Sequence, residues 1–276
     1  MSDQPAPSIR ATADGGILWA TIDHPPINLW DTAFTGDLVA LISRFASDDA
    51  ARVLVLTSAD DEYFIAHADV EMILNLGPEG SAPSDQPAPV NQLLDRLRTT
   101  PKVSIALVRG IARGGGSEIA LACDLRFATP DARFGQPEVA LGIIPGAGGT
   151  QRLTRLVGRA RALEIVLGCA DVTGDEAAAI GYVNRVLADD EIEDFVRALA
   201  TRIATLPPLA VGAAKRAVDA ALPDPTPGLI VEGAAFREAR LDPEAARRMR
   251  QFLEVGGQTR EGERTVETLL DRLTPP

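Results

Sequence analysis

Apolar runs bounded by turn residues predict several β-strands in the first half of the chain. Short runs of Val, Ile and Leu occur at Ile17–Ile22, Arg52–Thr57 and Val103–Val108. Between the first two runs, apolar residues recur at helical spacing and would bury one face of a helix: Leu38, Leu41, Ile42 and Phe45. The succession of strand, helix and strand predicts a mixed α/β core.

From about Thr173 the pattern is helical throughout. Thr173 with Glu176, and Asp190 with Glu193, have the spacing of a capping box. Apolar residues on one face follow the second box: Ile192, Phe195, Val196, Leu199 and Ile203. Pro207 and Pro208 would end that helix, and further helices are predicted at Val211–Leu222, at Leu229–Arg240 and from Asp242-Pro243 to Leu253. We therefore predict a boundary near residue 205, between a core (1–205) and a helical region (206–276).

The segment Gly77–Pro89 contains clustered Gly, Pro and Ser, so it can continue neither a helix nor a strand. An exposed, mobile loop is predicted. Long loops in compact domains often have a function, and a lid over a pocket is the alternative that this segment leaves open.

Composition and charge narrow the class of protein. With 46% hydrophobic and 24% charged residues, the chain is typical of soluble globular proteins. Its formal charge of -12 argues against a nucleic-acid or anionic-membrane surface, so an anionic ligand would have to be held locally. The longest uncharged stretch, Val139–Gln151, is too short to span a bilayer.

Cysteine usage and the start of the chain bear on its compartment. Cys123 and Cys169 lie in apolar surroundings without metal-ligand spacing, which favours buried thiols in a reducing compartment. Residues 1–8 are polar and proline-rich, unlike a secretion leader. A cytoplasmic location is the expectation.

Candidate chemistry lies where glycine-rich turns precede acidic residues. Gly114-Gly115-Gly116 follows a predicted strand and leads into Glu118 and an apolar helix, whose first N–H groups could bind an oxyanion. Dinucleotide binding requires glycine where Ile119 or Gln151 stands, and a serine-hydrolase elbow also requires glycine at Ile119. Only two histidines are present, too few for a histidine metal cluster.

What remains is a pair of carboxylates, Glu118 and Glu138, each beside a glycine-rich turn in an apolar stretch. In a cleft of low dielectric constant, such a pair divides acid and base roles and holds one water between them. These principles leave open a purely structural alternative, in which Glu118 stabilises a helix start and Glu138 braces a turn.

Three ordered runs together resemble the enoyl-CoA hydratases of the crotonase superfamily. They are Ile111–Asp124 (IARGGGSEIALACD), Phe134–Glu138 (FGQPE) and Leu141–Leu153 (LGIIPGAGGTQRL). With Val53–Met72, the similarity covers most of residues 15–190. The resemblance implies an α/β spiral of ββα units, a C-terminal helical region packed between subunits, and a homotrimer or dimer of trimers.

The resemblance also implies roles for individual residues. Glu118 and Glu138 match the two catalytic glutamates, Ala68 and Gly115 the two N–H donors of the oxyanion hole, and Gly146 the glycine that lines the water site. Contacts with the coenzyme portion of an acyl-CoA substrate are implied for Ala66, His67, Asp69 and Val70. No metal and no separate cofactor is expected.

Three features depart from the family pattern. His67 stands where glycine is frequent, and Glu71 replaces a frequent lysine near the anionic coenzyme. The run 254–263 (EVGGQTREGE) differs from the basic tail of many relatives. His67 is therefore a candidate for substrate selection or coenzyme contact, or else a solvated turn residue.

The activity implied is syn addition of water to a trans-2-enoyl-CoA, with Glu118 activating the water and Glu138 protonating the α-carbon. The alternatives are a Δ3,Δ2-enoyl-CoA isomerase or another crotonase-type lyase, and a non-catalytic CoA-binding protein of the same fold.

Overall fold

The computed structural model describes residues 6–77 and 84–273. Residues 78–83 of the predicted loop Gly77–Pro89 lie outside these ranges, and its last residue, Pro89, already begins a helix. No helix within the described ranges is both long and apolar enough to cross a bilayer.

Buried strands of Val, Ile and Leu form a six-stranded sheet in the order β1-β2-β3-β5-β7-β10. Its strands are β1 (Ile9–Asp14), β2 (Ile17–Ile22), β3 (Val53–Ser58), β5 (Val103–Val108), β7 (Leu125–Ala128) and β10 (Arg185–Val186). Only the β1–β2 pair is antiparallel, and Ile17 of β2 lies beside Val53, which in turn lies beside Val103. The predicted bounds of β2 and β5 are confirmed, and β3 starts one residue later than predicted.

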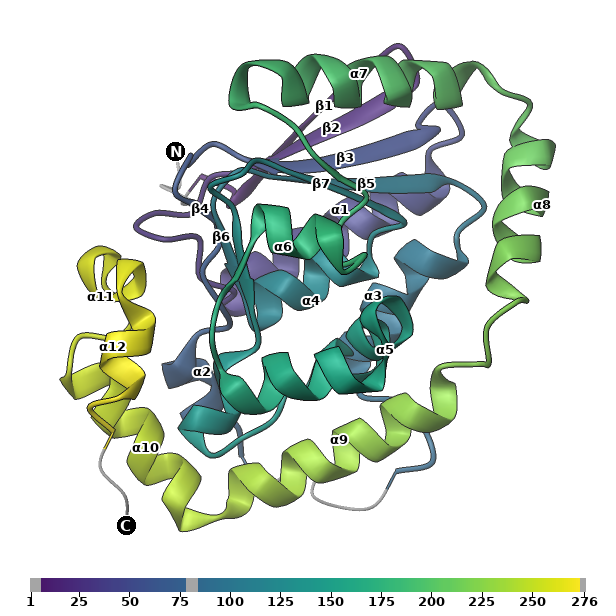
Figure 1. The fold of residues 1–276 in the computed structure, drawn as a ribbon. Coiled ribbons are helices and arrows are strands. Elements are labelled where there is room, and N and C mark those ends of the chain that lie inside the picture. Colours follow the sequence, from purple (N-terminus) through teal and green to yellow (C-terminus); the bar gives the residue numbers. More distant parts are fainter. Residues whose placement is uncertain (1–5, 78–83, 274–276) are drawn as a thin grey trace, which may run out of the picture.

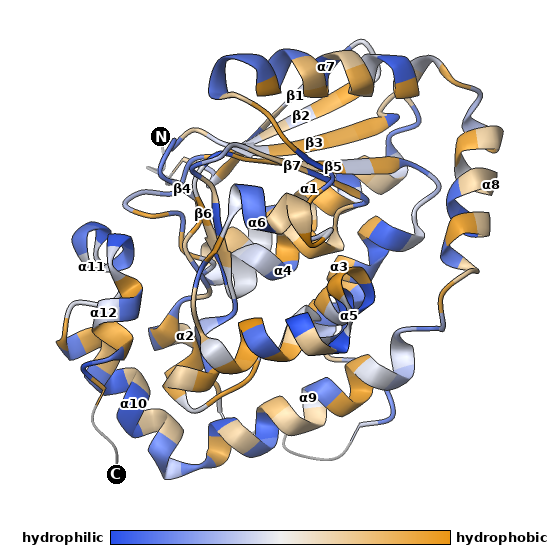
Figure 2. Cartoon of the chain, in the orientation of Figure 1, coloured by the Kyte–Doolittle hydropathy of each residue, from blue (hydrophilic) through white to orange (hydrophobic). Residues whose placement is uncertain are grey.

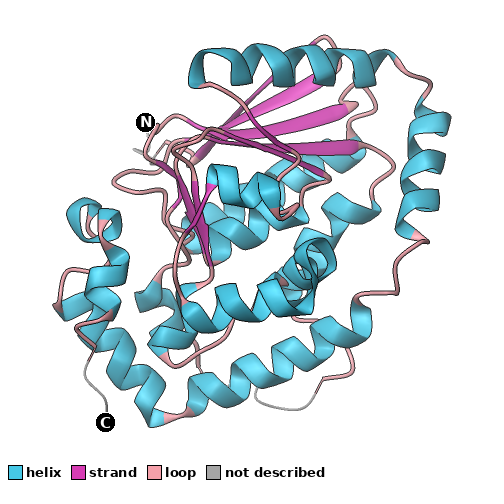
Figure 3. Cartoon of the chain, in the orientation of Figure 1, coloured by secondary structure: helices cyan, strands magenta, loops and turns pink. Residues whose placement is uncertain are grey.

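A smaller sheet in the order β4-β6-β8-β9 stands at an angle to the first (Figure 3). It comprises β4 (Tyr63–Ile65), β6 (Ile111–Arg113), β8 (Arg133–Gly135) and β9 (Val172–Thr173). Successive pairs β3–β4, β5–β6 and β7–β8 each give one strand to the large sheet and the next to the small sheet. The chain therefore winds as a spiral, and strand ends from different turns meet along one edge.

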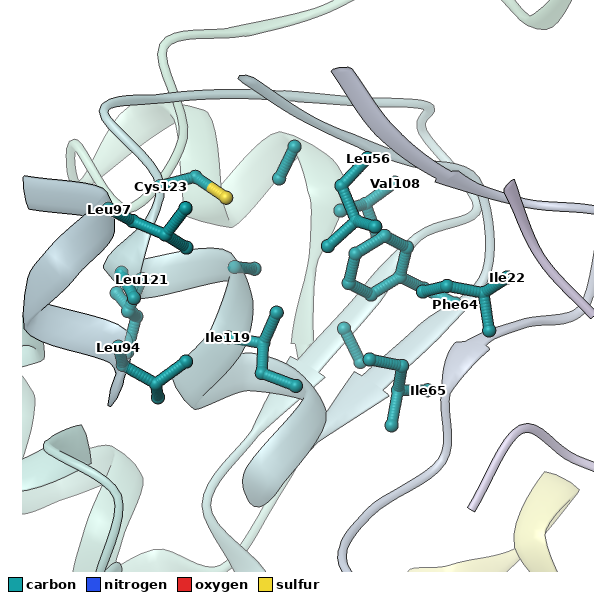
Figure 4. Packing of buried hydrophobic residues seen from close by; sticks show 14 of the residues in the cluster. Ile22, Leu56, Phe64, Ile65, Leu94, Leu97, Val108, Ile119, Leu121 and Cys123 are labelled. Atoms are coloured by element: carbon teal, nitrogen blue, oxygen red, sulfur yellow. The ribbon is translucent and has the colours of Figure 1, made fainter. Parts of the chain in front are cut away.

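Helices cover both faces of the large sheet (Figure 1). α7 (Asp189–Thr205) packs on one face through Ile192, Val196 and Ala200. The opposite face is covered by α1 (Thr32–Ser47), α3 (Pro89–Thr99) and α4 (Gly115–Ala122). Figure 4 shows Ile119 and Leu121 of α4 among side chains of the strands and of α3. The apolar face predicted at Leu38, Leu41, Ile42 and Phe45 is buried in this core, as expected.

The remaining helices surround the end of the spiral. They are α2 (Val70–Leu74), the 3-10 turn η1 (Pro137–Leu141), α5 (Gly149–Gly168), α6 (Gly174–Ala179), α8 (Pro208–Asp219), α9 (Thr226–Leu241), α10 (Pro243–Glu254), α11 (Arg260–Arg264) and α12 (Val266–Leu270). α10 and α12 pack against α2 and η1 in one apolar cluster. The C-terminal segment thus returns to the core of its own chain.

Two expectations for the second half are corrected. The Thr173–Glu176 capping box is present, but Asp190 is not an N-cap, because α7 begins at Asp189 after Ala188. The earlier start places three acidic residues in the first turn, where the helix dipole favours negative charge. The segment after Thr173 is also not purely helical, since β10 extends the large sheet beside β7.

Candidate active site

A strand, a glycine turn and a buried helix place the first candidate group. Gly114 follows β6 with φ +46° and is the N-cap of α4, a conformation that glycine adopts without strain. Every residue of α4 is buried. A Cβ on Gly116 would lie 2.2 Å from the carbonyl oxygen of Ile65, so this helix can approach β4 only with glycine there. The glycines predicted to form a tight turn therefore also bring α4 against the small sheet.

The backbone N–H groups of Ala68 and Gly115 lie next to each other. A Cβ on Gly115 would be 3.3 Å from the nitrogen of Ala68. The peptides around Ala68 are fixed by Trp30, whose N–H donates to His67 O at 2.9 Å and whose carbonyl oxygen accepts from Asp69 N at 3.0 Å. Among the described residues, neither the Ala68 nor the Gly115 N–H has a hydrogen-bond acceptor. Two adjacent N–H donors of this kind can bind one oxyanion.

Glu118 is held by the glycine-rich turn that precedes α5. Its Oε1 accepts from Ala147 N at 2.7 Å and from Gly149 N at 2.8 Å, and the side chain is buried. Burial raises the pKa of Glu118, the charge of Glu232 raises it further, and the two N–H donors oppose this shift. Glu118 is thus a carboxylate fixed in position, with its second oxygen left for another partner.

Glu138 lies in η1 close to Glu118. Burial raises the pKa of Glu138 well above its usual value, and the neighbouring charge of Glu118 raises it further. The Gln136 amide is oriented so that its nitrogen faces the Glu138 carboxylate and its oxygen faces the Ser117 hydroxyl. In this orientation the nitrogen donates to the carboxylate at 3.2 and 3.3 Å, and the oxygen accepts from Ser117 Oγ at 2.9 Å. Tyr182 OH contacts the same Ser117 hydroxyl. A buried polar chain therefore fixes the position of Glu138.

Sequence reasoning missed a third buried carboxylate, Glu232 of α9. It accepts from Gly148 N at 2.7 Å, from Thr150 N at 3.1 Å and from the Thr150 hydroxyl. The turn before α5 thus binds two carboxylates: the first and third of its four N–H groups donate to Glu118, and the second and fourth donate to Glu232. One cue was available: Glu232 is the only charged residue in the run 228–236 (GLIVEGAAF).

An apolar pocket opens beside Glu138. Val70, Ile73, Leu141 and Ile143 line it from the core, and the C-terminal segment adds Phe252, Val266 and Leu270. His67, Ala68 and Glu138 stand at its polar side. The pocket therefore adjoins both the Glu138 carboxyl group and Ala68, whose N–H is one of the two adjacent donors.

The other predicted site residues occupy varied positions. Gly146 packs against α9, since a Cβ there would lie 2.8 Å from the ring of Phe236, and its carbonyl oxygen accepts from Asn91. The side chains of Ala66 and Val70 are buried in apolar clusters. Asp69 caps α2 by accepting from Glu71 N at 2.9 Å. Their predicted contacts with a coenzyme stay predictions.

Comparisons with known proteins identify the family to which the chain belongs. The chain matches the enoyl-CoA hydratase/isomerase family over residues 12–254. It is 34% identical to a short-chain-enoyl-CoA hydratase of Clostridium acetobutylicum, over 87% of this chain and 92% of that one. Crotonyl-CoA hydratase of Syntrophomonas wolfei is 39% identical over 64% of this chain and 68% of its own.

Among solved structures, a Streptomyces avermitilis protein provisionally assigned as an enoyl-CoA hydratase superposes with a TM-score of 0.88. It is 36% identical and covers 96% of this chain and 98% of its own. The protein belongs to the enoyl-CoA hydratase/isomerase family and has the crotonase fold, as the sequence runs indicated.

Proposed function

We propose that the protein is an enoyl-CoA hydratase that adds water syn to trans-2-enoyl-CoA and gives 3-hydroxyacyl-CoA. The observation that carries this proposal is the convergence of two carboxylates, the buried Glu118 and the half-buried Glu138, beside the adjacent N–H groups of Ala68 and Gly115. The names of the hydratases from C. acetobutylicum and S. wolfei support it.

The hydrogen bonds of the two glutamates support different roles for them. Burial raises the pKa of Glu118 to about 8, and the two backbone N–H groups that donate to it limit this rise, so its ionised form takes a proton from the water as the oxygen attacks the β-carbon. Burial and the neighbouring charge of Glu118 raise the pKa of Glu138 well above its usual value, which favours its protonated form, so it protonates the α-carbon. The reverse reaction exchanges these roles.

Negative charge develops on the thioester oxygen when the water adds. The N–H groups of Ala68 and Gly115 stabilise that enolate, and donors of this kind typically contribute a factor of about 10² to 10³ in rate. Gly146 would line the space for the water. Ala66, Asp69 and Val70 would lie along the coenzyme, which enters as part of the substrate and not as a separate cofactor. His67 would contact either the coenzyme or the acyl group. We also propose a homotrimer or dimer of trimers in the cytoplasm.

Loss of the enoyl-thioester absorbance of crotonyl-CoA tests the activity. Glu118→Gln and Glu138→Gln should each lower kcat by roughly 10² to 10⁴, because each removes a proton-transfer group. Glu191→Gln, a substitution of the same kind at an exposed position of α7, is the control and should leave kcat unchanged.

Two other activities predict different results. An isomerase would leave crotonyl-CoA unchanged and convert a 3-enoyl-CoA. A non-catalytic CoA-binding protein would bind the thioester without turnover and would keep its affinity in both glutamine variants. Either result would contradict the proposed hydration.

A further inference from the structure

Two departures from the family pattern meet in the structure. His67 lies beside the predicted oxyanion hole, and Glu263 ends the unusual run 254–263. His67 Nε2 lies 3.0 Å from Glu263 Oε1, and both side chains are buried. Arg113 donates to Glu263 O at 2.8 Å and pairs with Asp171 at 2.7 Å. α11 is thus attached to the core at a point next to the candidate active site.

Both ring nitrogens of His67 face groups that accept hydrogen bonds. Nδ1 lies 2.7 Å from Ala68 O, and Glu263 Oε1 also accepts from Gln258 N at 2.9 Å. A ring that satisfies two acceptors must carry a proton on each nitrogen. Burial alone would lower the pKa of His67, but the charge of Glu263 and the hydrogen bonds to Glu263 and Ala68 raise it, despite Arg113 nearby. Glu138 is the other ionisable group that lines the same pocket.

The His67 ring forms one wall of the apolar pocket. It packs edge-on against Phe252, with ring centroids 5.9 Å apart, and its Cβ lies near Gly114 on the side of Glu138. The free space within the pocket is small, ≈ 30 Å³. Glycine at position 67 would leave the volume of the ring empty.

We propose that the His67–Glu263 pair determines acyl-chain length: it holds a doubly protonated ring as the wall of the acyl pocket and fastens α11 beside it. Short enoyl groups then fit in the pocket beside the ring, and long ones are excluded because the ring and Phe252 close it. This inference rests on the proposed hydratase function.

The ratio of kcat/KM for trans-2-octenoyl-CoA to that for crotonyl-CoA tests the role in specificity. His67→Gly should raise this ratio by about tenfold or more, because a few methylene groups of pocket space change discrimination by that amount. Glu263→Gln keeps the shape of the side chain but removes the charge that holds the ring, so the ratio should rise in the same direction. Glu261→Gln, an exposed position of the same helix, is the matched control and should not change it.

An unchanged ratio in a His67→Gly protein that still hydrates crotonyl-CoA would overturn the inference. If that variant does not fold, an unchanged ratio in Glu263→Gln has the same meaning. A wild-type protein that hydrates neither thioester would instead overturn the proposed function.

The protonation of the ring can be measured without substrate. The chain has only two histidines, so nitrogen-15 NMR of the full-length protein resolves His67 from His24, with His67→Gly giving the assignment. Both nitrogens of His67 should stay protonated to a higher pH in the wild-type protein than in Glu263→Gln, because the charge of Glu263 raises the pKa of the ring. Loss of the second proton at the same pH in both proteins would contradict the ion pair.

Discussion

At the scale of single residues, the turn before α5 holds two carboxylates at once. The N–H groups of Ala147 and Gly149 face Glu118, and those of Gly148 and Thr150 face Glu232. Successive peptide N–H groups in this turn point to opposite sides. Substitution of one carboxylate would therefore alter the position of the turn that binds the other, in addition to removing a nearby charge. Glu232 therefore fixes the same turn that holds the proposed base, Glu118.

Glu232→Gln should shift the pH dependence of kcat/KM. The charge of Glu232 raises the pKa of Glu118, so its removal lowers that pKa, and the rise in activity that follows ionisation of the base should move to lower pH. The measurement is the pH–rate profile with crotonyl-CoA. Glu238→Gln, an exposed position of the same helix, should keep the wild-type profile. A purely structural role would lower activity at every pH without moving the profile.

The sequence predicted some site residues and not others, for a physical reason. Glu118 and Glu138 stand within continuous motifs whose glycine turns are visible locally. Glu232 acts on a turn whose N–H groups lie 82 and 84 residues earlier in the chain, and the Glu263 partner of His67 lies 196 residues later. Such contacts depend on how the C-terminal segment returns to the core, which local patterns do not specify.

At the scale of elements, strand length and apolar content decided what could be predicted. β1 has six residues but only Ile9 of it is buried, so no apolar run marks it. β2 and β5 have six residues each, enough to form an apolar run between turn residues. β6 and β8 have three residues each, and β9 and β10 two, too few for a period to be visible. The small sheet, which positions α4 and the Ala68 segment, was therefore missed although its glycine turns were found.

Two glycines in helices give opposite predictions. Gly116→Ala in α4 should lower the free energy of unfolding by more than about 2 kcal/mol, because the added Cβ meets Ile65 O at 2.2 Å. Gly36→Ala in α1 meets nothing within 4 Å and should raise that free energy by about 0.5–1 kcal/mol. Urea denaturation of both variants measures the difference. A stable Gly116→Ala protein would show that α4 can move away from β4.

At the scale of the whole molecule, α8 and the outer side of α9 expose apolar side chains. Only Gly212 of α8 is buried, whereas Leu209 is 80% exposed, Val218 71% and Val231 of α9 67%. Figure 2 shows these hydrophobic stretches along α8 at the edge of the molecule. Soluble monomers rarely expose apolar residues in such continuity, so this surface supports the proposed trimer contact.

Leu209→Glu combined with Val218→Glu should therefore dissociate the assembly, because two charges would lose their hydration in an apolar contact. Light scattering after gel filtration should give a mass near that of one 29.2 kDa chain for the variant and a multiple of it for the wild-type protein. Val39→Glu, at an exposed valine of α1, is the control and should keep the wild-type mass. A wild-type protein that elutes as a monomer would refute the proposed assembly and leave the apolar surface of α8 for another partner.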